Sequence, residues 1–123
     1  MGILDSIFGK TSSTLVNPWV RIESPENIQQ AIDESYNRKT IIFKHSTRCG
    51  ISSRVLSQFE KEIAAQKPNV GLYYLDLLAH RDLSNSIASE FGITHQSPQI
   101  LVLENGKIIH HASHSSISLN DFI

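Results

Sequence analysis

The sequence predicts an α/β fold with a central mixed β-sheet flanked by α-helices. Short apolar runs of the kind that form buried strands alternate with segments whose apolar residues recur at helical spacing, in the order β-α-β-α-β-α. The last third of the chain instead has two apolar runs joined by Asn105-Gly106, the dipeptide most typical of a two-residue hairpin. We therefore expect a parallel sheet that ends in an antiparallel hairpin.

The elements of the first half can be placed from their end signals. Ser24 and Pro25 are typical of the N-cap and first position of a helix, and the apolar residues that follow them lie on one helical face. A buried strand is expected next, because the following apolar run is short and continuous. The predicted order is a strand at Trp19–Ile22, a helix from Pro25 to about Tyr36 and a strand at Thr40–Lys44.

The second half follows the same logic. Apolar residues recur at helical spacing from Ile51 to near Lys67, and again at Leu83, Ile87 and Phe91, where Gly92 is a helix stop. The intervening and later segments are predicted to be a strand at Val70–Asp76, two hairpin strands at Gln99–Glu104 and Lys107–His111, and a closing helix at Ser118–Ile123.

Length and composition fit one soluble domain. Of the 123 residues, 40% are apolar and 19% charged, so a hydrophobic core is expected. Residues 18–123 are predicted to form this domain, and residues 1–17 an amphipathic segment followed by a Ser/Thr-rich linker. The formal net charge of −1 argues against a nucleic-acid partner. We expect no membrane span and no signal peptide.

The single cysteine points to an intracellular protein with thiol chemistry. Cys49 has no internal partner for a disulfide, as is usual in a reducing cytoplasm. It lies where the second predicted strand gives way to a helix, and backbone N–H groups at a helix start stabilise an anion. Lys44 and Arg48 would add to this effect if their side chains point toward the sulfur. We therefore expect Cys49 to ionise more readily than a free thiol, although an inert surface or packing role is the alternative.

Two neighbours could assist the sulfur. Ser52 occupies the position where dithiol oxidoreductases keep the second cysteine of C-x-x-C, and its hydroxyl could donate a hydrogen bond to Cys49. It cannot resolve a mixed disulfide, so a second thiol must come from outside. His45 could act as a base or charge partner, but its place at a strand end could also direct it elsewhere.

Two further groups of residues need comment. In Ser97-Pro98-Gln99, a trans proline that begins an edge strand is the reading favoured by the sequence alone. His110 and His111 are adjacent on a predicted strand, which sends their side chains to opposite faces, so we predict no metal site.

The segment K-H-S-T-R-C-G-I-S at 44–52, together with S-P-Q before the hairpin, resembles the thioredoxin-like superfamily and most closely the monothiol bacilliredoxins of the YtxJ family. The resemblance covers about residues 18–123. It implies a thioredoxin-like fold and a cis Pro98, which would expose the Ser97 backbone to a bound substrate. Gly50 stands where that family usually has proline, a change that loosens the helix start.

This resemblance implies that Cys49 removes bacillithiol, or a similar low-molecular-weight thiol, from protein mixed disulfides. The partners would be S-thiolated client proteins and the small thiol as co-substrate, with no tightly bound cofactor. We expect Arg48, Lys44 and Gln99 to hold the anionic parts of that thiol. Two other functions stay open: a non-catalytic thioredoxin-like binding module, and a redox sensor whose cysteine is capped by a small thiol.

Overall fold

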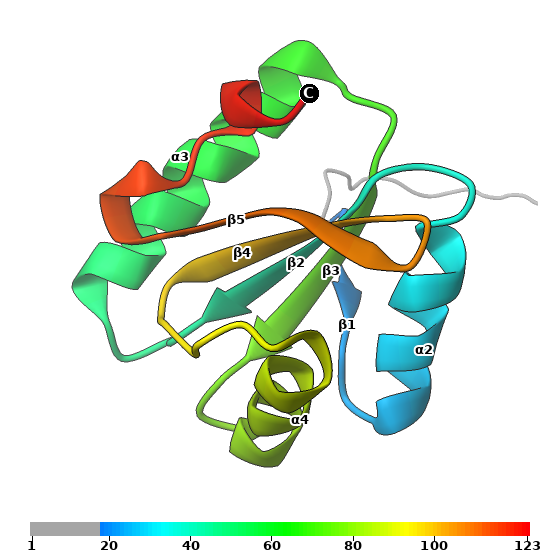
Figure 1. Cartoon of the computed structure of the whole chain (residues 1–123). Helices are drawn as coiled ribbons and strands as arrows, with labels where there is room; N and C mark the ends of the chain where they lie inside the picture. The colour runs from blue at the N-terminus through cyan, green and yellow to red at the C-terminus, as the bar shows by residue number, and fades with distance from the viewer. Residues whose placement is uncertain (1–17) are drawn as a thin grey trace, which may run out of the picture.

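A computed structural model describes residues 18–123, and the predicted N-terminal segment at 1–17 lies outside the described residues. The described part forms a five-stranded mixed sheet with helices on both faces (Figure 1). The elements are β1 (Val20–Arg21), α2 (Pro25–Glu34), β2 (Thr40–His45), α3 (Gly50–Gln66), β3 (Gly71–Asp76), α4 (Arg81–Phe91), β4 (Gln99–Glu104), β5 (Lys107–Ser113) and the 3₁₀ turns η2 (His114–Ser116) and η3 (Leu119–Asp121).

The strand order β1-β3-β2-β4-β5 confirms the predicted mixed sheet. Strands β1 and β2 pair in parallel with β3, whereas β4 is antiparallel to both β2 and β5. At the hairpin turn Asn105 and Gly106 both have positive φ angles, of 53° and 77°, as a two-residue turn of the type I′ kind requires.

The predicted closing helix is wrong. The C-terminal residues form only the single 3₁₀ turn η3, because tertiary bonds rather than a helical ladder hold them. The Leu119 N–H donates to Glu62 Oε1 on α3, and the Phe122 carbonyl accepts from Lys39 Nζ at 2.7 Å. The first strand is also shorter than predicted, and α2 ends at Glu34, before the predicted end at Tyr36.

The sheet separates two hydrophobic clusters. We call the side covered by α3 and the C-terminal turns the α3 face, and the other side the α2/α4 face (Figure 1). On the α3 face the rings of Trp19, Phe43 and Phe59 pack together, with centroids 5.8–6.4 Å apart. The α2/α4 face is mainly aliphatic, and its largest ring is that of Tyr73. Alternation along β2 divides its residues between the two clusters.

Within residues 18–123, none of the helices has the length and apolar character needed to cross a bilayer.

Candidate active site

The carboxyl ends of β2 and β3 and the start of β4 lie at the same end of the sheet, and α3 begins there (Figure 1). The register pairs Lys44, near the end of β2, with Leu75 near the end of β3 and with Gln99 at the start of β4. The loop that carries Cys49 and the loop that carries Pro98 therefore leave the sheet at the same edge, where α/β folds usually place their sites.

Cys49 lies at the N-cap of α3, as the sequence predicts. A turn closed by the Cys49 N–H and the Ser46 carbonyl, 3.1 Å apart, leads into an extended residue with φ −104° and ψ 117°. The Cys49 carbonyl accepts the first helical bond, from the Ser53 N–H at 3.0 Å. The N–H groups of the first turn lack helical acceptors, and Cys49, the residue at this end of the helix, is partly exposed. This position suits a thiolate that must also meet a substrate.

Ser52 is fully buried beneath this helix start. Its Oγ accepts a bond from the Ser46 N–H at 3.2 Å and lies 2.7 Å from His45 Nδ1. The bond to the Cys49 sulfur that the sequence suggests is absent from the structure, because the Ser52 hydroxyl bonds to Ser46 and His45 instead.

His45 points to the α3 face, which decides between the two directions left open for it. Its ring packs near those of Phe43 and Tyr74, with centroids at 6.4 and 5.7 Å. Burial lowers the pKa of His45, and the carboxylates of Asp76 and Glu60 oppose that effect only in part. A neutral imidazole bonded to Ser52 thus lies under the helix start.

Lys44 does not meet the condition under which it would act on the sulfur, because its side chain points away from α3. Strand alternation sends this side chain to the α2/α4 face, opposite to α3, where Nζ donates to the Ser84 carbonyl of α4 at 3.3 Å. The side chain is wholly buried, and burial lowers the pKa of Lys44 from 10.5 to about 8. Lys44 is therefore part of the interior beside α4.

Gln99 also differs from its expected role in binding the small thiol. Only 2% of the residue is exposed, Nε2 donates to the Thr94 carbonyl at 3.0 Å, and Oε1 has no partner within the described chain. Because Gln99 lies across from Lys44 in the β2–β4 register, its side chain belongs to the same buried layer. The Gln99 side chain therefore holds the loop before β4 through its bond to Thr94.

The Ser97–Pro98 peptide bond is cis, as the family resemblance implies. The Pro98 carbonyl accepts from the His114 N–H at 3.0 Å, which ties this loop to the end of β5. Ser97 Oγ is buried and has no hydrogen-bond partner among residues 18–123. Arg48, by contrast, is exposed in the turn before Cys49 and forms no ion pair with any described residue.

A small polar cluster on the α2/α4 face was missed by the sequence reasoning. Ser84 receives the Lys44 bond through its carbonyl, and its Oγ lies 3.1 Å from Nδ1 of His95. Burial lowers the pKa of His95, and the nearby Lys44 and Arg81 charges add to this. No local motif marks this cluster, because its members are 11 and 40 residues apart in the chain.

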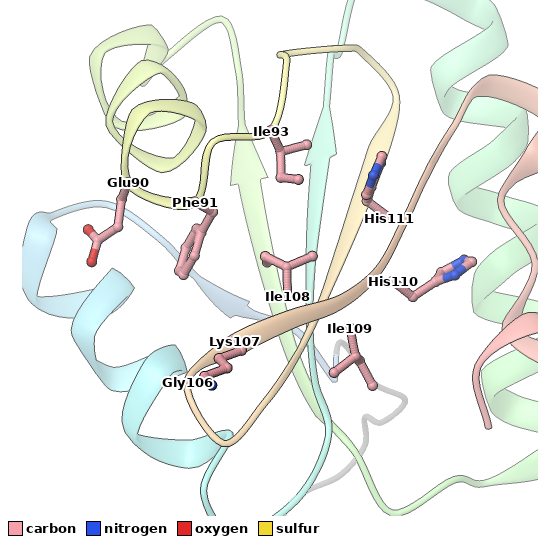
Figure 2. Close-up of a pocket in the computed structure, with 9 residues that line it drawn as sticks. All are labelled: Glu90, Phe91, Ile93, Gly106, Lys107, Ile108, Ile109, His110 and His111. Atoms are coloured by element: carbon pink, nitrogen blue, oxygen red, sulfur yellow. The ribbon is translucent and has the colours of Figure 1, made fainter.

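The histidines of β5 point in different directions, as strand alternation predicts (Figure 2). His110 packs 5.5 Å from the ring of Phe122, whereas His111 points toward the loop before β4. Residues 18–123 contain no group of three or more metal-ligating side chains.

Surface hollows lie beside several of these elements. A groove of about 510 Å³ lies between the end of α4 and β5, and its lining includes none of the predicted site residues (Figure 2). A smaller hollow of about 220 Å³ lies between α3 and the η2 segment and is lined by Arg54, Val55, Gln58, Ser115 and Ile117. A third hollow, of about 340 Å³, is lined by the loop before β4, by Gln99 at the start of β4, and by His111 and Ser113 of β5.

Comparison with known proteins gives one family and one fold. The family model described as "Monothiol bacilliredoxin BrxC" matches residues 20–122. A solved structure described as having a thioredoxin fold is 30% identical, with a TM-score of 0.74 over 84% of this chain and 88% of that one. Two thioredoxins share the fold: that of Trypanosoma brucei brucei, at 22% identity and TM-score 0.62 over 80% of each chain, and that of Nicotiana alata, at 20% and 0.64 over 85% and 88%.

Proposed function

The chain belongs to the monothiol bacilliredoxin family, and on that premise we propose that it removes bacillithiol from mixed disulfides of client proteins. The family and the fold make it a thiol–disulfide oxidoreductase in general terms. The observation that carries the finer proposal is the position of its only cysteine, Cys49, at the N-cap of α3 and partly exposed. A sulfur in this position can act as a nucleophile, and the chain has no second cysteine with which it could form a disulfide.

In the first step the Cys49 thiolate attacks the bacillithiol sulfur of a client mixed disulfide. The client–bacillithiol S–S bond breaks, the client cysteine leaves as a thiolate, and a Cys49–bacillithiol disulfide forms. No net oxidation of the two proteins taken together occurs, because one disulfide replaces another.

The second step needs an external thiol. Ser52 occupies the position of a resolving cysteine, but a serine hydroxyl cannot replace a thiolate in attacking a disulfide. A second bacillithiol, as thiolate, attacks the bacillithiol sulfur of the Cys49 adduct. The products are free Cys49 thiolate and bacillithiol disulfide, so bacillithiol is a co-substrate and not a bound cofactor.

Substrate binding is proposed at the edge shared by the two loops. The backbone of Ser97, next to cis-Pro98, can pair with the peptide around the disulfide in β fashion. Arg48 is exposed directly before Cys49 and has no partner charge among residues 18–123, which suits the anionic part of a small thiol. The proposed setting is the cytoplasm, without nucleic-acid or membrane partners.

Intact-mass measurement of a bacillithiolated client tests the proposal. With bacillithiol present, wild-type protein should release client thiol through many turnovers, whereas Cys49→Ser should give only the background rate of the small thiol alone. A matched arm with a glutathionylated client reports the thiol preference. Equal client release by both proteins would refute an enzymatic role.

Stoichiometry separates the enzyme from the sensor and the binding module. A Cys49–bacillithiol adduct that forms once and resists excess bacillithiol would indicate a capped sensor. Client binding without any adduct would indicate a binding module. Arg48→Gln should raise the KM for the bacillithiolated client by about twofold to fivefold, as for loss of one exposed charge contact. Lys61→Gln, on the exposed side of α3, is its control.

A further inference from the structure

A hydrogen-bonded group of three residues lies directly under Cys49. Ser52 and His45 are both at least nine-tenths buried, and their polar atoms are 2.7 Å apart. The Ser46 N–H donates to the same Ser52 oxygen at 3.2 Å. These bonds join the end of β2 to the first turn of α3, so the hydroxyl of Ser52 is fixed in place beside the N-cap.

The hydrogen of the Ser52 hydroxyl can serve only one acceptor at a time. A hydroxyl has one hydrogen and two lone pairs, and the Ser46 N–H occupies one of the lone pairs. If His45 Nδ1 is unprotonated, it accepts the Ser52 hydrogen. If Nδ1 carries a hydrogen, it donates to the second lone pair, and the Ser52 hydrogen is released for another acceptor.

The sulfur of Cys49 is the acceptor that the helix geometry offers. Cys49 is the N-cap of α3 and Ser52 the third residue after it, so both side chains leave the first turn of the helix. In the structure Ser52 is bonded to His45 and Ser46 and not to the sulfur, so a bond to the sulfur requires the hydroxyl hydrogen to be released. An anionic sulfur accepts a hydrogen bond more strongly than a neutral one. Ionisation of Cys49 therefore favours the arrangement in which His45 Nδ1 donates and Ser52 gives its hydrogen to the sulfur.

We propose that His45 is a positioning residue for Cys49: by holding or releasing the Ser52 hydrogen, it sets whether that hydrogen is donated to the sulfur. This inference rests on the proposed function, since it matters only if the Cys49 thiolate exchanges disulfides. It assigns the histidine a role that acts through Ser52 and does not require contact with the substrate.

The charged and titratable groups that face His45 act in opposite directions. Asp76 of β3 and Glu60 of α3 favour a positively charged ring, while burial favours the neutral ring and outweighs them. The phenol of Tyr74, beside the ring, stays protonated because burial and the Asp76 charge raise its pKa. His45 is thus neutral near neutral pH, and the position of its hydrogen, rather than its charge, is the variable.

The first test follows both residues in one titration. The ionisation of Cys49 is monitored by thiolate absorbance, and the ring nitrogens of His45 by ¹⁵N NMR, in the full chain. In wild-type protein the His45 signals should shift at the pH where Cys49 ionises. In Ser52→Ala the Cys49 inflection should rise by about one pH unit, a roughly tenfold loss of thiolate below it, and the coupled His45 shift should vanish. Ser53→Ala, exposed on the next position of α3, should change neither signal.

A second variant gives an effect of opposite sign. His45→Phe keeps a ring against Phe43 and Tyr74 but removes the competitor for the Ser52 hydrogen. The Cys49 inflection should therefore move down, whereas a purely structural loss would loosen the helix start and move it up, as in Ser52→Ala. An unchanged or raised inflection in His45→Phe, or His45 signals that ignore the ionisation of Cys49, would overturn the proposal.

These readouts do not depend on turnover. If bacillithiol transfer fails but the coupled titration is seen, the proposed function is wrong and the positioning role stands as a property of the thiol. If transfer proceeds but the Cys49 inflection rises in His45→Phe as it does in Ser52→Ala, the positioning role is wrong and the proposed function still stands.

Discussion

Lys44 and His45 are neighbours on β2, yet they serve opposite faces of the sheet. On the α3 face, His45 bonds to Ser52 under the cysteine loop. On the α2/α4 face, Lys44 is enclosed with Ser84 and Gln99. Of these two adjacent polar residues, His45 therefore lies beside the candidate active site, and Lys44 lies in the interior on the other face. Proximity in sequence to a reactive residue is a poor guide to function where a strand alternates.

The strongest test of this comparison is removal of the Lys44 charge. Burial lowers its pKa from 10.5 to about 8, which corresponds to about 3 kcal/mol of unfavourable free energy when the ammonium is charged. Lys44→Met should therefore raise the free energy of unfolding near neutral pH by about 1–3 kcal/mol, the lower part of that range reflecting loss of the Ser84 bond. Urea denaturation measures it, with the exposed Lys61→Met as control.

The pH dependence fixes the sign of that effect. In the folded state Lys44 loses its proton at lower pH than in the unfolded state, so the unfolded chain binds more protons between about pH 8 and 10.5. Wild-type stability should rise across that interval and Lys44→Met should lack the rise. A drop in bacillithiol transfer of more than about tenfold in Lys44→Met would instead restore the role that the sequence predicts for this residue.

A smaller effect, of opposite sign, is expected at Tyr73 on the α2/α4 face. Its hydroxyl donates to Glu34 Oε1 at 2.6 Å, and Arg38 pairs with the same carboxylate. Tyr73→Phe should lower the free energy of unfolding by about 1–2 kcal/mol and leave transfer unchanged. Tyr36→Phe is the matched control, because that ring is 62% exposed.

Acid titration refines the Tyr73 prediction. Burial acts to raise the pKa of Glu34, but the bonds from Tyr73 and Arg38 outweigh it and the pKa is lowered. The stabilisation by Glu34 is therefore present above the unfolded pKa of about 4.5 and is lost as pH falls through the lower folded value. Tyr73→Phe should reduce this acid-induced loss, and an identical acid profile would contradict the assignment.

The smallest effect is expected on the α3 face, at the residue after the cysteine. A side chain at Gly50 would meet open space, and the φ and ψ of Cys49, −104° and 117°, suit a residue before proline. Gly50→Ala and Gly50→Pro should each raise stability by about 0.5–1 kcal/mol in thermal unfolding. Only the proline removes a first-turn N–H, so only Gly50→Pro should also slow alkylation of Cys49. Destabilisation by proline would show that the helix start differs from this description.

The sequence predicts local features well because they depend on neighbouring residues. Asn105-Gly106 marks the hairpin and Cys49 the start of α3, since turn and cap signals act within a few positions. The closing helix failed for the opposite reason: bonds to Glu62 and from Lys39, both distant in sequence, shape those last residues.

The direction of the site residues depends on similar non-local facts. Every residue of β2 is buried, so no exposed polar side marks which face receives α3, and the sequence could not show where Lys44 points. The pairing of Ser84 with His95 and the bond from Ser52 to His45 link separate elements, and no spacing rule reports them. The sequence alone identified Cys49 as the nucleophile, but the contacts among His45, Ser46 and Ser52 are visible only in the structure.

The turn that presents Cys49 also provides a single site for attaching a spectroscopic label. Because this is the sole sulfhydryl in the sequence and it is partly accessible, a maleimide fluorophore or spin label will attach at one defined atom without prior mutagenesis. A dye placed there would sense any molecule that approaches the neighbouring loops.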